Sequence, residues 1–154
     1  MDTNGSEHIG APVETVWRAL NDPEILRRSI PGCQALDKLS ETEMTATVVL
    51  KIGPLKATFQ GSVELLNLNP PHAYTINGEG KGGIVGFAKG SADVSLVADG
   101  PDATILSYTV RAEVGGKIAQ MGSRLIDSTA RKLAGQFFTN LGGKLADQPA
   151  MTGT

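Results

Sequence analysis

Hydrophobic and polar positions follow three successive patterns along the chain. After a short extended start, apolar residues recur at helical spacing between positions 13 and 20. Asp22 as N-cap and Pro23 at the first helical position then favour a second helix. The pair Pro31-Gly32 ends that helix. The first pattern therefore predicts an initial strand followed by two short helices.

The second pattern is an alternation of apolar and polar residues, which is typical of strands with one dry and one wet face. It begins at Ala35 and is clearest on both sides of the turn Gly53-Pro54. Turn residues separate the later strands, so we expect an antiparallel meander. The clearest predicted strands are, in chain order, 44–52, 55–65, 73–77, 84–96 and 106–114.

The third pattern returns to helical spacing after Gly115-Gly116 and carries a broad apolar stripe from Ile118 to Leu141. This helix spans about 25 residues, well above the mean of about 11–12. Only the dry face of the sheet is long enough to bury its stripe. We therefore expect an α+β fold in which a curved antiparallel sheet wraps around a long C-terminal helix. Residues 1–146 are predicted to form a single domain, and 147–154 a flexible C-terminal tail.

The dry faces of the predicted strands carry many small residues, among them Ala46, Gly61 and Ala88. Two arrangements remain open: the helix packs tightly on the sheet, or it stands off and leaves a hollow for an apolar small molecule. In the second case the expected lining residues are Val48, Phe59, Phe87, Tyr108, Val110, Met121 and Leu125. The mouth of the hollow is expected near Ile25, Leu26, Ile30 and the glycine-rich hairpin 78–90.

Composition and charge narrow the choice of partners and compartment. The 154-residue chain has a net charge of −2 and its 14 Lys and Arg residues are scattered, so nucleic acid is not an expected partner. Cys33 is the only cysteine, and the N-terminus lacks the pattern of a secretory leader. No segment reaches the roughly 18 apolar residues of a membrane span. These features predict a cytoplasmic protein, with at most a peripheral contact at the inner face of the cytoplasmic membrane.

Motifs with a chemical role are few. The series Gly-x-Gly-x-x-Gly at 78–83 matches the dinucleotide fingerprint, but that fingerprint needs a helix directly after it, where a strand is predicted. His8, His72 and Cys33 lack the spacing of metal ligands. Tyr108 is the one polar group expected in the hollow, bonded either to a ligand carbonyl or to the backbone. We therefore expect no catalytic residue, no metal site and no covalently bound cofactor.

Several segments match one known pattern when they are taken together. They are 9–26, Ile30-Pro-Gly-Cys33, Gly53-Pro-Leu-Lys-Ala57, Gly78-Glu-Gly-Lys-Gly-Gly83, Gly86-Phe-Ala-Lys-Gly90 and 115–127. Over residues 9–138 the chain resembles the CoxG family, which takes its name from the G subunit of carbon monoxide dehydrogenase. The resemblance implies the SRPBCC or START-like helix-grip fold and an accessory role beside molybdenum hydroxylases of the carbon monoxide dehydrogenase type. It also implies recruitment of that enzyme to the membrane and handling of a lipid-soluble quinone.

Larger members of this family carry a C-terminal extension with a membrane-seeking segment, whereas this chain ends soon after Gly142-Gly143. The main hypothesis is a non-catalytic protein that binds an apolar ligand, with polyprenyl quinone as the candidate, and that assists or recruits the hydroxylase. One alternative is a protein-interaction or maturation module with a filled core and no ligand. Another is an enzyme like the polyketide aromatases and cyclases, which needs acids or bases that the predicted lining lacks.

Overall fold

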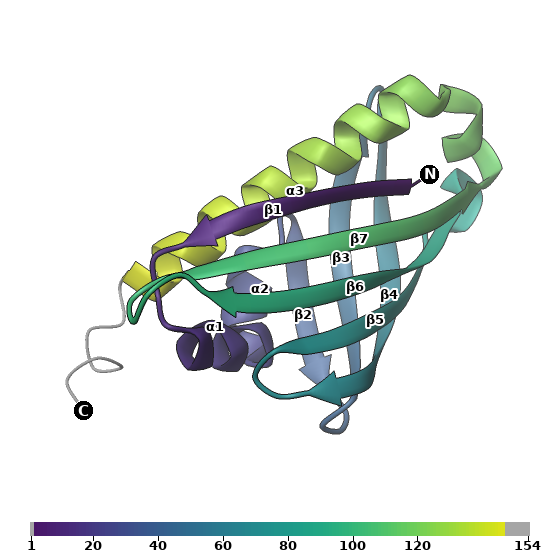
Figure 1. The fold of residues 1–154 in the computed structure, drawn as a ribbon. Coiled ribbons are helices and arrows are strands. Elements are labelled where there is room, and N and C mark those ends of the chain that lie inside the picture. Colours follow the sequence, from purple (N-terminus) through teal and green to yellow (C-terminus); the bar gives the residue numbers. More distant parts are fainter. Residues whose placement is uncertain (1, 147–154) are drawn as a thin grey trace.

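A curved antiparallel sheet wraps around a long C-terminal helix in the computed structural model, which describes residues 2–146 (Figure 1). Its strands are β1 (Asp2–Ile9), β2 (Cys33–Lys38), β3 (Glu43–Ile52), β4 (Leu55–Asn69), β5 (Ala73–Lys81), β6 (Phe87–Ala98) and β7 (Thr104–Gly115). They form one seven-stranded sheet in the order β1-β7-β6-β5-β4-β3-β2. The predicted α+β class, with a curved sheet around a long helix, is confirmed.

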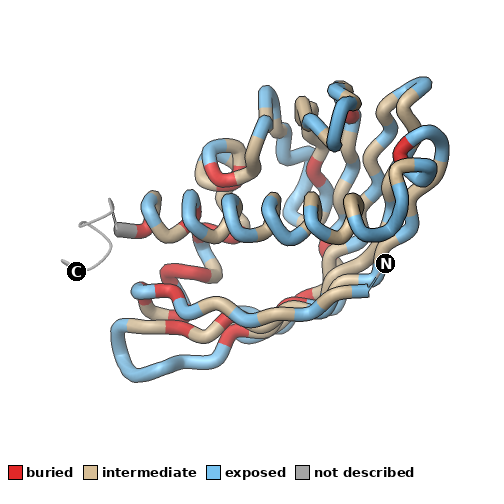
Figure 2. Tube along the Cα trace, turned by 90° about the horizontal axis from the view of Figure 1, so that it is seen from above, coloured by how far each residue is buried: buried red, intermediate tan, exposed pale blue. Residues whose placement is uncertain are grey.

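Helices cover the open side and one end of the sheet. They are α1 (Val13–Leu20), α2 (Pro23–Ser29), α3 (Ser123–Ala146) and the short 3-10 helices η1 (Gly83–Val85) and η2 (Gly116–Met121). Figure 2 shows α3 crossing the open side of the sheet, with buried residues appearing near its C-terminal end. Among residues 2–146, no helix is long and apolar enough to cross a membrane. The single domain at 1–146 stays a prediction, and the predicted tail at 147–154 lies outside the described residues.

The predicted start of the second helix is confirmed at Asp22. Oδ1 of Asp22 accepts a hydrogen bond from the backbone N–H of Glu24 at 2.9 Å, and Pro23 occupies the first position of α2. Such a cap satisfies a backbone donor that has no partner within the helix. The cap allows α2 to begin almost directly after α1, so both short helices lie at the same end of the sheet.

The structure corrects the predicted C-terminal helix and one strand start. The sequence predicts a continuous helix after position 116, but the chain forms η2 first and α3 starts only at Ser123. Gly122, between them, has a φ of +91°, which residues with a side chain rarely adopt. Residues 83–85 form η1, and the strand that the sequence places there begins only at Phe87.

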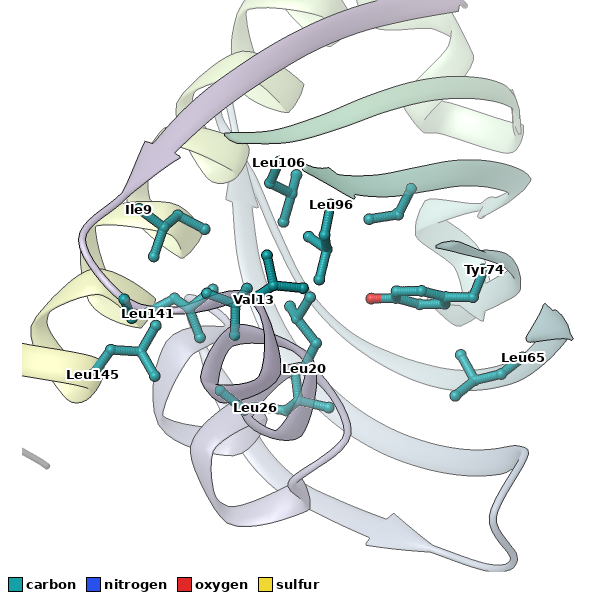
Figure 3. Close-up of a cluster of buried hydrophobic side chains, with 14 of the residues drawn as sticks. Ile9, Val13, Leu20, Leu26, Leu65, Tyr74, Leu96, Leu106, Leu141 and Leu145 are labelled. Atoms are coloured by element: carbon teal, nitrogen blue, oxygen red, sulfur yellow. The ribbon is translucent and has the colours of Figure 1, made fainter. Parts of the chain in front are cut away.

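The main hydrophobic core lies where α1, α2 and the last turns of α3 meet the sheet (Figure 3). Val16 and Leu141 are 0% exposed, and Leu106 is 1% exposed. The ring of Trp17 meets that of Tyr74 edge-on, with 5.2 Å between the ring centroids. Hydrophobic stabilisation is therefore concentrated at one end of the molecule.

Replacement of Leu141 by alanine tests this distribution. Leu141→Ala removes a fully buried side chain and is expected to lower the free energy of unfolding by about 2–5 kcal/mol. Leu39→Ala is the matched control, because Leu39 is 63% exposed and its loss should change stability by at most about 0.5 kcal/mol. Urea denaturation of the two variants measures the difference. Equal effects would contradict a core at this end.

Candidate functional site

An apolar cavity of about 380 Å³ lies between the sheet and the N-terminal half of α3. Strands β3 to β7 form its floor and walls, α3 and η2 cover it, and the segment after α2 closes one side. Its surface consists almost entirely of apolar atoms. The lining residues are Ile30, Pro31, Val48, Leu50, Ile52, Phe59, Gly61, Gly80, Ala88, Ala112, Val114, Ile118, Ile126, Thr129, Ala130 and Leu133.

The cavity has a floor of small residues that the strand register places side by side. Gly61 of β4 lies opposite Ala46 of β3 on one side and Gly80 of β5 on the other. Gly80 in turn lies opposite Ala88 of β6. Side chains at these positions point to the same face, because they occupy one row across neighbouring strands. The hollow therefore results from several missing side chains in one row.

Contacts at both ends of α3 hold the helix above this floor. At the C-terminal end, Leu141 is buried in the core, and Nδ2 of Asn140 donates a hydrogen bond to the Ser29 carbonyl at 3.0 Å. At the other end, Met121 and Leu125 reach the turn between β3 and β4. A Cβ built on Gly53 in that turn would lie 2.9 Å from Leu125 Cδ2 and 3.0 Å from Met121 Cε. The helix is thus supported on both sides of the cavity.

The structure brings three of the ten predicted ligand-binding residues together in the cavity lining, namely Ile30, Val48 and Phe59. Met121 and Leu125 belong to the elements that cover the cavity, but their side chains lie against Gly53 at the β3–β4 turn. Both are therefore supports at the end of the cavity.

The other five predicted residues lie elsewhere. Leu26 is buried in the main core, and Ile25 packs against that core. Tyr108 stacks on Phe138 of α3 with 5.6 Å between the ring centroids, on the side of β1. Two residues are outside the lining on strands that contribute to it, namely Val110 on β7 and the 40% exposed Phe87 on β6.

Sequence reasoning missed most of the lining for a definable reason. The alternation correctly puts Leu50, Ile52 and Val114 on the dry face, but it does not say how far along each strand the helix stands off. Ile118 and Leu133 belong to the predicted apolar stripe, yet stripe membership alone does not separate core from cavity. The one usable signal is the coincidence of small residues in neighbouring strands.

A wider depression of about 820 Å³ lies on the wet face of the sheet, but its lining is dominated by charged and polar side chains. Lys89 Nζ and Glu113 Oε2, two of its members, lie 3.7 Å apart and are largely exposed. Ion pairs of this kind contribute little in water. This face is a solvated surface, and the apolar cavity is the better candidate for a site.

The cavity offers no acid or base for catalysis, because no ionisable side chain belongs to its lining. Cys33 lies outside it, where burial raises the pKa of the thiol and Sγ donates to the Ala35 carbonyl at 3.3 Å. A thiol with a raised pKa is a poor nucleophile. Residues 2–146 contain no group of three or more His, Cys, Asp or Glu side chains placed to hold a metal ion. What the cavity can do is exclude water from a ligand held by shape.

Comparison with known proteins gives one family and several related folds. The family model of CoxG, described as the G subunit of carbon monoxide dehydrogenase, matches residues 5–146. The crystal structure of a conserved protein from Geobacillus kaustophilus is similar over 96% of this chain and 97% of that one, with 32% identity and a TM-score of 0.91. No curated protein matches the sequence.

Two more distant structures show the fold alone. One is a START superfamily protein from Mycobacterium smegmatis, with 17% identity, a TM-score of 0.73, and coverage of 95% of this chain and 97% of that one. The other is the Zhui aromatase/cyclase from Streptomyces sp. R1128, with 10% identity, a TM-score of 0.67, and coverage of 96% and 94%. The predicted START-like helix-grip fold is confirmed by these neighbours.

Valine in place of Gly61 tests whether the floor is empty. A Cβ at Gly61 would meet only backbone oxygens at 3.6 and 3.7 Å, which is ordinary contact, and the methyl groups of a valine there are expected to occupy part of the cavity. Because glycine destabilises a strand, we expect Gly61→Val to raise stability by about 1 kcal/mol and Tm by about 2–4 °C. Ser62→Val, on the wet face of the same strand, measures the strand-propensity effect alone. A lower Tm for Gly61→Val would contradict the cavity.

Proposed function

The chain belongs to the CoxG family of carbon monoxide dehydrogenase, and from that membership we propose that it binds an apolar small molecule for a molybdenum hydroxylase of the carbon monoxide dehydrogenase type. The observation that carries the proposal is the apolar cavity of about 380 Å³ beneath α3. Sites for small molecules commonly measure about 300–1,000 Å³ and are mostly apolar. A protein that needs no ligand gains stability by filling such a space, so the cavity favours a carrier over a module with a filled core.

Polyprenyl quinone is the proposed ligand class. Most of such a molecule is hydrocarbon, and each methylene group moved out of water contributes about 0.8 kcal/mol to binding. The resemblance to family members that handle a lipid-soluble quinone as the electron acceptor of the hydroxylase supports this choice. The carrier would then assist or recruit the enzyme by keeping the quinone out of water.

A binding role is favoured over a catalytic one. General acid–base chemistry needs a titratable group within hydrogen-bond reach of the reacting atoms, and the cavity lining has none. The sequence identity to the Zhui aromatase/cyclase is only 10%. Because one fold hosts many unrelated functions, this likeness does not favour a catalytic role. The chemistry of the lining therefore supports retention of a ligand without conversion.

Native mass spectrometry of the protein purified from its own host, with organic extraction of the same sample, tests the carrier role. We expect a prenylquinone or another lipid at near-stoichiometric occupancy in the wild type. Gly61→Val should lose about half of the bound ligand, since roughly 1.4 kcal/mol of lost contact lowers affinity tenfold and takes a nearly full site to about half occupancy. Ser62→Val should retain it, because its side chain lies on the wet face.

Two outcomes would contradict this proposal. The carrier role would be contradicted if the wild-type protein held no ligand and bound no added quinone. If ligand-free Gly61→Val still captured and supported the hydroxylase from the same host, the interaction or maturation module would replace it.

We also propose a peripheral contact between the cavity end of the molecule and an anionic lipid surface. Segment 115–124 adjoins segment 81–87 on one side and, through Met121 beside Gly53, segment 51–56 on the other, and the three segments contain no acidic residue. Ile84, in η1, is 83% exposed and projects an apolar side chain there. Each cation near an anionic bilayer contributes about 1 kcal/mol, and an apolar side chain can insert between headgroups. The exposed cations of these segments are Lys51, Lys56, Lys117, Arg124 and Lys81, the last of which pairs with Glu79 at 3.5 Å.

Vesicle sedimentation tests the lipid contact. The wild type should bind vesicles that contain phosphatidylglycerol, and added salt should weaken the binding because it screens exposed charges. Ile84→Ser should lower the affinity about tenfold. Val97→Ser is the matched control, since Val97 is 62% exposed near the other end of β6. Equal binding to uncharged phosphatidylcholine vesicles, or equal loss in both variants, would contradict the contact.

A further inference from the structure

The cavity wall presents almost no hydrogen-bonding atom to a ligand. Thr129 is the only lining residue with a polar side chain, yet the cavity surface is almost entirely apolar, so its hydroxyl contributes almost nothing to it. The backbones of Gly61 and Gly80 form the floor, and both belong to paired strands, Gly61 opposite Gly80 and Gly80 opposite Ala88. Their polar groups lie in the plane of the sheet, where neighbouring strands hydrogen-bond. A ligand oxygen inside the cavity would find almost no partner.

This lack of partners selects between the two parts of an amphipathic ligand. A carbonyl that leaves water without finding a donor loses its hydration, and that loss lowers affinity roughly five- to hundredfold per group. A methylene group placed in the same position raises the affinity of the ligand roughly fourfold. The wall therefore discriminates against a quinone ring with its two carbonyls and favours hydrocarbon.

The cavity volume sets a limit to the length of that hydrocarbon. A dry apolar cavity of about 150 Å³ is known to hold one benzene ring. By the same ratio, the cavity of about 380 Å³ holds roughly fifteen carbon atoms, which is the size of three isoprene units. A longer chain extends beyond the cavity.

The edge of the sheet beside β3 is the candidate exit from the cavity. β2 begins at Cys33, opposite Val48, so the rest of β3 beyond this pair has no neighbouring strand on that side. Leu50 and Ile52 of this free edge belong to the cavity lining, as does Pro31 just before β2. We therefore assign the exit for the portion of a ligand that does not fit to this place, between the edge of β3 and α3.

From these observations we propose that the cavity is a hydrocarbon site, which holds a prenyl or alkyl segment of roughly fifteen carbon atoms while the polar head of the ligand stays outside. The inference rests on the proposed binding of an apolar ligand and specifies which part of that ligand is recognised. It assigns recognition to the tail of a prenylquinone and makes the head group a minor contributor to affinity.

A matched pair of ring compounds tests the preference for hydrocarbon. The probes are 2,3-dimethylnaphthalene and 2,3-dimethyl-1,4-naphthoquinone, which share a skeleton and differ by two carbonyl oxygens. Substitution at both positions also blocks addition of the Cys33 thiol to the quinone. Displacement of N-phenyl-1-naphthylamine, followed by fluorescence, gives both affinities. We expect the hydrocarbon to bind at least tenfold more tightly.

A series of prenyl alcohols tests the length limit. Affinity should rise at least tenfold from geraniol to farnesol and then change less than threefold on going to geranylgeraniol. Gly61→Val, which reduces the cavity volume, should remove most of the gain from geraniol to farnesol, whereas Ser62→Val should leave it unchanged.

The outcomes separate this inference from the proposed function. Equal or tighter binding of the quinone, or affinity that keeps rising from farnesol to geranylgeraniol by tenfold or more, would overturn the hydrocarbon site and leave the carrier role standing. If no compound of either series bound to the wild type, both would fall together.

Discussion

α3 is held firmly at its two ends and stands free of the sheet between them, and the cavity depends on this arrangement. Its last turns are buried with α1 and α2, where Leu141 has no exposed surface and Asn140 bonds to the backbone of α2. Its first turn is held by Leu125 beside the β3–β4 turn. Were either contact missing, the apolar stripe would be free to settle on the small residues beneath it, because a hollow this size leaves many atoms without close neighbours.

The small residues below α3 have an energetic meaning as well. Gly61 and Gly80 each weaken the strand that contains them, since glycine loses more backbone freedom on folding than other residues. In an ordinary core such positions carry larger side chains that fill the space. Glycine at these positions lowers the stability of the fold but leaves space for a ligand, which is a common compromise at binding sites. The main core at the other end of the molecule supplies the stability that the cavity region lacks.

The sequence predicts local features well and the position of the site only in part. Alternation identifies the dry face of β3, β4, β6 and β7, and Asp22 and Pro23 mark the start of α2, because both signals depend on neighbouring residues alone. The lining of the cavity depends on strand register and on where the helix stands off, and neither follows from local pattern. Tyr108 illustrates the difference: it faces inward as the pattern indicates, but Phe138 stacks against it at the side of the core. Gly122 likewise ends η2 through its backbone geometry, whereas the apolar spacing continues across it.

The two attachments of α3 differ in kind, and this has a consequence for motion. The C-terminal attachment is part of the buried core, so that opening it exposes Leu141 and requires much of the core to separate. The N-terminal attachment consists of Met121 and Leu125 at a turn, and it lies next to Gly122, whose backbone is free to change direction. The C-terminal end of α3 is therefore fixed in the core, whereas its N-terminal end is held by a few contacts that can break locally. Backbone amides in its first turns should exchange with solvent through small local openings, on a shorter timescale than those of the last turns, even in a protein that never unfolds.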